Sequence, residues 1–167
     1  MLWSLHSFPL LVPPTQKTTL LNHHQIDDSL LEKCAPLGDP PVVLHVEDDQ
    51  EFSAALRCRL EAHGVAVVRA FDGDEGIRQS RVRKLDAILI DYELPNANGE
   101  KVLEALREHE STKYLPVIVI TGRKDKQLKL RMQELGASAH LTKPVKFDDL
   151  RKQLARHIDI LPQPSLS

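Results

Sequence analysis

The 167-residue chain has the length of one domain of ordinary size, with some residues to spare. Its 22 Lys and Arg residues nearly balance 24 Asp and Glu residues, so the net charge of −2 argues against a nucleic-acid or anionic-membrane surface. No apolar run approaches the roughly 20 residues of a membrane span, and we find no signal peptide. Two cysteines cannot form a disulfide framework, which favours a reducing, cytoplasmic location.

The composition changes near residue 41. Six of the 11 prolines but only one of the seven glycines lie before residue 42. We therefore expect a flexible extension over residues 1–40, a folded domain over residues 41–160 and a short tail over residues 161–167. A docking arm or a dimerisation helix within the extension stays open as the alternative.

Between the extension and the tail, short apolar runs alternate with amphipathic segments. The apolar runs predict strands at 42–46, 65–68, 86–90, 116–120 and 139–142. The amphipathic segments predict helices over about 50–63, 74–83, a stretch opened by Asn98 and Gly99, 125–135 and 147–160. Because the strand runs are continuously apolar, both faces of the sheet should be covered. The pattern predicts an α/β fold with a parallel, doubly wound sheet between two helical layers.

Polar side chains stand at the ends of four of the expected strands. Glu47 and Asp48 follow the first, Asp91 the third, Thr121 the fourth and Lys143 the fifth. In open α/β sheets, ligands bind beyond the carboxyl ends of the strands, where the strand order reverses. If the order is 2-1-3-4-5, this point lies between the first and third strands, and the three carboxylates meet there.

Three carboxylates in one crevice repel each other, and a divalent cation relieves that repulsion. Carboxylate and water ligands suit Mg²⁺ or Mn²⁺. A carboxylate nucleophile beside an ammonium and a hydroxyl has the parts for phosphoryl transfer to aspartate. Asp91 would attack phosphorus, Lys143 would neutralise charge and Thr121 would donate a hydrogen bond.

Four segments of the chain resemble the receiver domain of two-component response regulators: VVLHVEDDQE, LIDYELPNANG, VIVITGR and HLTKP. The resemblance covers about residues 41–160, and the spacing of the polar residues agrees with the family pattern. It implies a three-layer, CheY-like (flavodoxin-like) (βα)₅ fold with strand order 2-1-3-4-5. It also implies that Asp91 is phosphorylated by a histidine kinase or a phosphotransfer protein.

The resemblance further implies a role for each matched position. Glu47 and Asp48 match the acidic pair that holds Mg²⁺, and the backbone carbonyl of Glu93 completes the metal shell. Thr121 matches the hydroxyl that moves toward the phosphoryl group. Lys143 matches the family lysine, which precedes a proline whose peptide bond is usually cis.

Two features depart from the family pattern, one at a single position and one at a pair of positions. His140 stands where the family usually has the Tyr or Phe that swings inward on phosphorylation. Either the imidazole takes that switch role with a pH dependence, or it is a partly exposed polar strand residue. Glu93 and Arg123 flank the expected phosphoryl site, and we hypothesise that they pair across it and lengthen the lifetime of the phosphoryl group.

We therefore expect a phosphoacceptor switch rather than a turnover enzyme. Its output would be a protein target or a second copy of the chain, and the resemblance implies that this partner binds through the face made by 125–135, 139–142 and 147–160. Only seven residues follow the last expected helix, which disfavours a DNA-binding output. A phosphorylation-independent scaffold stays as the alternative, whereas a haloacid-dehalogenase-type phosphatase would need Asp-x-Asp-x-Thr after the first strand.

Overall fold

The structure is a computed structural model that describes residues 38–162. The predicted extension lies outside this range, apart from residues 38–40, and so do residues 163–167 of the predicted tail.

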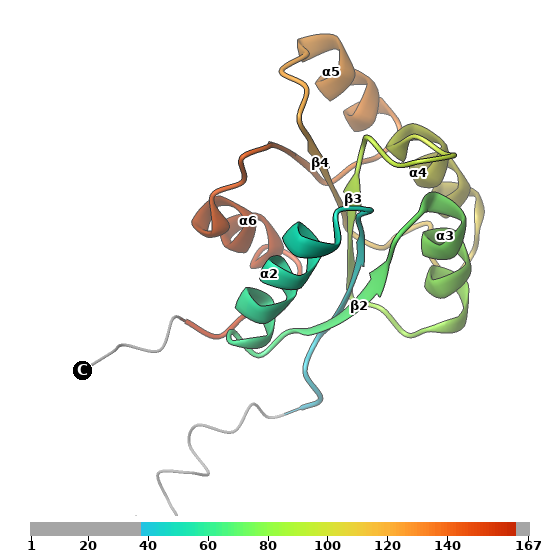
Figure 1. The fold of residues 1–167 in the computed structure, drawn as a ribbon. Coiled ribbons are helices and arrows are strands. Elements are labelled where there is room, and N and C mark those ends of the chain that lie inside the picture. The colour runs from blue at the N-terminus through green and yellow to red at the C-terminus, as the bar shows by residue number, and fades with distance from the viewer. Residues whose placement is uncertain (1–37, 163–167) are drawn as a thin grey trace, which may run out of the picture. The chain divides into compact units, whose positions relative to one another are not determined.

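A five-stranded parallel sheet with the order β2-β1-β3-β4-β5 forms the centre of the fold (Figure 1). The strands are β1 (Val42–Val46), β2 (Ala66–Ala70), β3 (Ala87–Asp91), β4 (Val117–Thr121) and β5 (Ala139–Thr142). This order confirms the predicted CheY-like topology. The strand order reverses between β1 and β3, as a doubly wound sheet requires.

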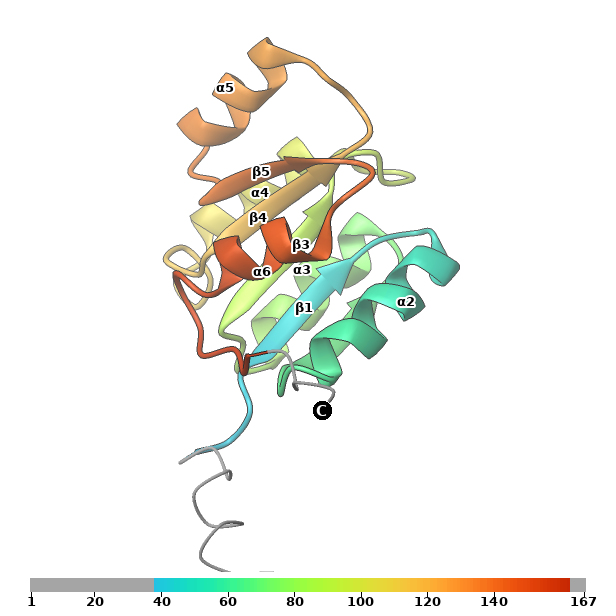
Figure 2. The ribbon, with the colours of Figure 1, turned by 90° about the vertical axis from the view of Figure 1, so that its left-hand side faces the viewer.

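Five helices cover the two faces of the sheet. They are α2 (Gln50–Glu61), α3 (Gly73–Val82), α4 (Gly99–Glu108), α5 (Lys126–Glu134) and α6 (Phe147–Leu154). In Figure 2, α2 and α6 lie on one side of the sheet, and α3 and α4 lie behind it. The core is correspondingly split into two clusters, one beneath α2 and α6 and one beneath α3, α4 and α5. Strands β3 and β4 are buried along their whole length, which explains their continuously apolar sequences.

Side-chain caps set the starts of four helices. The carboxylates of Asp49, Asp72 and Asp125 and the amide oxygen of Asn98 accept backbone N–H groups of the first helical turns. The expected end of the last helix is wrong, because α6 stops at Leu154 rather than near residue 160.

A turn after α6 explains that difference. The backbone N–H of Ile158 donates to the carbonyl of Leu154 at 3.0 Å, so Ile158 still packs into the core although the helix has ended. The apolar spacing is therefore satisfied by a turn as well as by a helix, and the spacing alone does not locate the helix end.

Gly99 allows α4 to begin directly against the end of β3. A Cβ atom on Gly99 would lie 2.9 Å from the Cα of Tyr92 and 3.0 Å from the carbonyl oxygen of Asp91. The backbone N–H of Gly99 also donates to the carbonyl of Tyr92 at 2.9 Å. The close approach fixes the loop that follows Asp91.

We predict that Gly99→Ala lowers the free energy of unfolding by about 1–3 kcal/mol, because a methyl group there would push against backbone atoms that cannot rotate away. Urea denaturation measures the change. Gly38→Ala is the matched control, since a Cβ there meets nothing within 4 Å. Equal stabilities of the two variants would contradict this account of the α4 start.

Candidate functional site

The expected site residues lie at one edge of the sheet, where the parallel strands end. Glu47 and Asp48 follow β1, Asp91 closes β3, Thr121 closes β4 and Lys143 follows β5. The reversal of strand order places the first three on either side of the gap between β1 and β3.

Three carboxylates form a compact acidic cluster at this edge. Glu47, Asp48 and Asp91 each offer one oxygen, and these oxygens lie within 4.8 Å of one another. Glu47 is 1% exposed and Asp91 is 3% exposed, whereas Asp48 is open to solvent. The cluster thus has two buried carboxylates at its base and one at its mouth.

The ammonium of Lys143 joins the two buried carboxylates. Its Nζ donates to Oδ2 of Asp91 at 2.6 Å and to Oε1 of Glu47 at 3.1 Å. Oε2 of Glu47 is also 2.9 Å from Nζ, but without hydrogen-bond alignment, so this oxygen has an ionic contact and no hydrogen bond among the described residues. Burial works against the charged ammonium, but the hydrogen bonds that it donates to Asp91 and Glu47, together with their negative charges, outweigh burial and raise the pKa of Lys143.

One ammonium does not fully compensate two buried carboxylates. Burial raises the pKa of Glu47 to about 7, and the negative charge of Asp91 adds to this, while the hydrogen bond from Lys143 opposes it. The crevice therefore remains short of positive charge. A cluster of oxygen donors that includes a buried carboxylate oxygen without a hydrogen bond fits a hard divalent cation.

The side chain of Glu93 crosses from β3 to the end of β4. Its Oε2 accepts the backbone N–H of Gly122 at 2.9 Å and the hydroxyl of Thr121 at 3.3 Å. Its backbone N–H donates to Oδ1 of Asp91 at 3.1 Å. Thr121 is fully buried, and its Oγ1 accepts the backbone N–H of Arg123 at 3.0 Å.

The expected pair between Glu93 and Arg123 is not formed within residues 38–162. The guanidinium of Arg123 instead lies 3.5 Å from the carboxylate of Asp125 and 5.7 Å from the ring centroid of Tyr92. Glu93 finds donors on the Thr121–Gly122 segment, which is nearer to the buried strand ends, so the exposed Arg123 is left to pair locally.

His140 lies in β5, with a partly buried side chain. Its strand neighbours Ala139 and Leu141 pack into the core beneath α2 and α6, so His140 points to the opposite face, which carries α5. Burial lowers the pKa of His140, and the charge of Lys129 on α5 adds to the effect. Within the described part of the chain, its buried Nε2 has no hydrogen-bond partner. Both effects favour the neutral form of the imidazole, and its role as a switch stays a prediction.

A buried polar chain beside the acidic cluster was missed by the sequence reasoning. Nδ1 of the fully buried His45 lies 3.2 Å from Oγ of Ser53, which in turn accepts Nε–H of Arg69 at 2.8 Å. Burial, followed by the charges of Lys143 and Arg69, lowers the pKa of His45 to about 4. The signal was a single histidine within the apolar run of β1.

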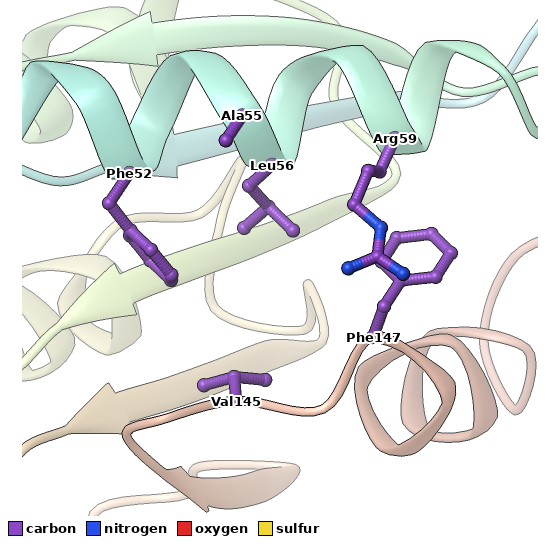
Figure 3. Close-up of a pocket in the computed structure, with 6 residues that line it drawn as sticks. All are labelled: Phe52, Ala55, Leu56, Arg59, Val145 and Phe147. Atoms are coloured by element: carbon purple, nitrogen blue, oxygen red, sulfur yellow. The ribbon is translucent and has the colours of Figure 1, made fainter.

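An apolar groove adjoins the cluster on the α2 side of the sheet. Figure 3 shows the groove, which has a volume of about 220 Å³ and is lined by Phe52, Ala55, Leu56, Arg59, Val145 and Phe147. Nζ of Lys143 lies 4.9 Å from the ring centroid of Phe52, so the groove begins where the cluster ends. The sequence did not predict this groove.

Comparison with known proteins decides the family. The family model of the response regulator receiver domain matches residues 43–155. The chain belongs to this family. The receiver is 32% identical to protein PilH of Pseudomonas aeruginosa over 67% of the chain and 93% of PilH. It is also 31% identical to hybrid signal transduction histidine kinase D of Dictyostelium discoideum, over 75% of the chain.

Several relatives are longer than the receiver. The chain spans 8% of the Dictyostelium kinase, 55% of the response regulator ArlR of Staphylococcus saprophyticus and 48% of PhoB of Rhizobium meliloti. The similarity to these proteins therefore concerns one part of each.

Solved structures agree with the receiver fold. A response regulator from Chloroflexus aurantiacus is 31% identical with a TM-score of 0.67, covering 70% of the chain and 96% of that structure. The receiver domain of sensor kinase PA1611 from Pseudomonas aeruginosa is 26% identical with a TM-score of 0.65, covering 70% of the chain and 96% of that structure. That structure holds a magnesium ion in its active-site cleft. Among the helices of residues 38–162, none is long and apolar enough to cross a membrane.

Proposed function

We propose that this receiver accepts a phosphoryl group on Asp91 in a Mg²⁺-dependent reaction and thereby switches a protein-binding surface. The observation that supports it most is the contact of 2.6 Å between Nζ of Lys143 and Oδ2 of Asp91, within a cluster of three carboxylates. The partly exposed ammonium of Lys143, held against Oδ2 of Asp91, leaves the other oxygen of Asp91 as the nucleophile. The comparisons give no support to the alternative of a phosphorylation-independent scaffold.

The metal would be held by the side chains of Glu47, Asp48 and Asp91, together with the backbone carbonyl of Glu93. Mg²⁺ prefers such oxygen ligands and leaves several positions to water and phosphate, and Mn²⁺ accepts the same set. When bound, the ion supplies positive charge that neutralises the phosphoryl oxygens.

The transfer step is a displacement at phosphorus. A carboxylate oxygen of Asp91 forms the new O–P bond while the P–N bond of a phosphohistidine breaks, and the released imidazole nitrogen takes up a proton. Lys143 neutralises the developing charge, and the hydroxyl of Thr121 and the N–H of Gly122 donate hydrogen bonds to the phosphoryl oxygens. The protein itself carries the product, so we propose a stoichiometric acceptor with slow self-dephosphorylation rather than a turnover enzyme.

The donor would be a histidine kinase or a phosphotransfer protein that docks on the groove beside the cluster. The groove is apolar, lies against Phe52, and so adjoins the ammonium that contacts Asp91. A helix seated on α2 and on the segment before α6 would bring its phosphohistidine to the mouth of the cluster.

The output face would consist of α5, β5 and α6. Phosphorylation adds about two negative charges and shifts a two-state equilibrium between the site and this face. Thr121 moves toward the phosphoryl group, and His140 on the neighbouring strand responds. A downstream protein or a second copy of the chain would read the change.

Incubation with acetyl phosphate and Mg²⁺ tests the acceptor role. We expect intact-mass measurement to show the gain of one phosphoryl group in the wild type and none in Asp91→Asn or in the presence of a chelator. Hydrogen exchange of α5 and β5 should change in the same samples. Equal mass gain in Asp91→Asn, or no gain in the wild type, would overturn the proposal.

A second experiment tests the docking groove. Ala55→Tyr fills the groove without touching Asp91, so it should slow transfer from any phosphohistidine protein that phosphorylates the wild type by at least about tenfold, while acetyl phosphate still phosphorylates it. The matched control is Ala62→Tyr, at the exposed C-cap of the same helix and outside the groove. Equal transfer rates for both variants would place the donor elsewhere.

A further inference from the structure

We propose that the carboxylate of Glu93 is an internal latch that occupies the phosphoryl-binding donors of the unphosphorylated receiver. The inference rests on the proposed function, because it concerns the same donors. A single oxygen, Oε2 of Glu93, accepts both the N–H of Gly122 at 2.9 Å and the hydroxyl of Thr121 at 3.3 Å. These are the two donors that the phosphoryl oxygens need.

The hydrogen bonds around Thr121 fix the direction of its hydroxyl proton. Oγ1 of Thr121 accepts the backbone N–H of Arg123 at 3.0 Å, so its own proton is directed to Oε2 of Glu93. The hydroxyl therefore points at an anion that belongs to the protein. It becomes available to a phosphoryl oxygen only after the Glu93 side chain has left.

The surroundings of Glu93 allow such a departure. The backbone of Glu93 is held by its N–H bond to Oδ1 of Asp91, but its side chain is exposed to solvent. A Cβ atom built on Gly122 would meet, within 4 Å, only the carboxyl group of Glu93. Rotation of this one side chain thus uncovers the Gly122 amide without any change in the core.

Electrostatic repulsion prevents the phosphoryl group and the Glu93 carboxylate from occupying the same two donors at once. A phosphoryl group on Asp91 carries about two negative charges and cannot share two hydrogen-bond donors with a carboxylate. Glu93 therefore slows phosphorylation because it occupies the N–H of Gly122 and the hydroxyl of Thr121. Its displacement frees Thr121. The latch couples the acceptance of the phosphoryl group to the movement of the β4 end.

The test is the time course of phosphorylation by acetyl phosphate at fixed Mg²⁺, followed by intact mass. Glu93→Ala removes the latch, and Glu93→Asp keeps the charge but is one methylene too short to span both donors. We expect both variants to react on the order of fivefold faster than the wild type, the factor that corresponds to about 1 kcal/mol for a hydrogen bond to Glu93 that no longer has to be broken. The charge-matched control, Glu108→Ala, changes an exposed acid at the far end of α4 and should react like the wild type.

Unchanged rates in both Glu93 variants would overturn the latch. A faster Glu93→Ala with a Glu93→Asp at the wild-type rate would also overturn it, because charge alone would then explain the effect.

An independent readout needs neither metal nor phosphodonor. The latch predicts that the amide proton resonance of Gly122 moves upfield in Glu93→Ala and in Glu93→Asp, because its acceptor is lost, and stays in place in Glu108→Ala. An unmoved Gly122 resonance would overturn the latch even where the acceptor role holds. Failure of the wild type to become phosphorylated would instead remove the proposed function, while the Gly122 shift would still report the contact.

Discussion

The ammonium of Lys143 between two buried carboxylates is the interaction on which this structure depends. Glu47 and Asp91 come from neighbouring parallel strands, and both are almost wholly withdrawn from water. An unpaired buried charge costs several kcal/mol, so neither carboxylate is tolerable there without a partner. Lys143, which follows the distant edge strand, reaches both. The single positive charge of Lys143 therefore neutralises the two buried carboxylates only in part.

The fold delivers these three groups to one place through its topology. Each stands at or directly after the carboxyl end of a strand, and the reversal of strand order opens the crevice between β1 and β3. The ring of Phe52 covers the ammonium on the α2 side. Because Gly99 has no Cβ atom, the start of α4 lies directly against the loop after Asp91. The acceptor is thus fixed by packing on both faces of the sheet, whereas Asp48 and Glu93 remain exposed and able to move.

Much of this arrangement was predictable from the sequence. Continuously apolar runs identified the strands, because doubly covered strands have no polar face. Asn98 and Gly99 marked the start of α4, where the amide oxygen of Asn98 caps the helix. The meeting of Glu47, Asp48 and Asp91 followed once the strand order was known. These features depend on local rules and on a topology that admits few alternatives.

The remaining features depend on which side-chain partners meet in three dimensions. The hydrogen bond of Glu93 to Gly122 instead of a pair with Arg123 reflects the relative reach of two side chains, which spacing does not encode. The link from His45 through Ser53 to Arg69 joins two strands and a helix. The apolar pattern does not predict that α6 ends at Leu154, because a turn keeps Ile158 on the same face as a longer helix would.

The most direct test of the central claim compares the free energy of unfolding of the wild type and of Glu47→Gln, with a chelator present, at about pH 5.5 and about pH 8. The pKa of Glu47 is about 7 in the folded chain against 4.5 for an ordinary glutamate, so the folded state binds the extra proton between these values. The contribution of Glu47 to the free energy of unfolding therefore increases as the pH falls from about 7 toward 4.5, and it decreases as the pH rises again. The account predicts that the advantage of Glu47→Gln over the wild type grows from about pH 5.5 to about pH 8. The same pH dependence in both proteins would contradict it.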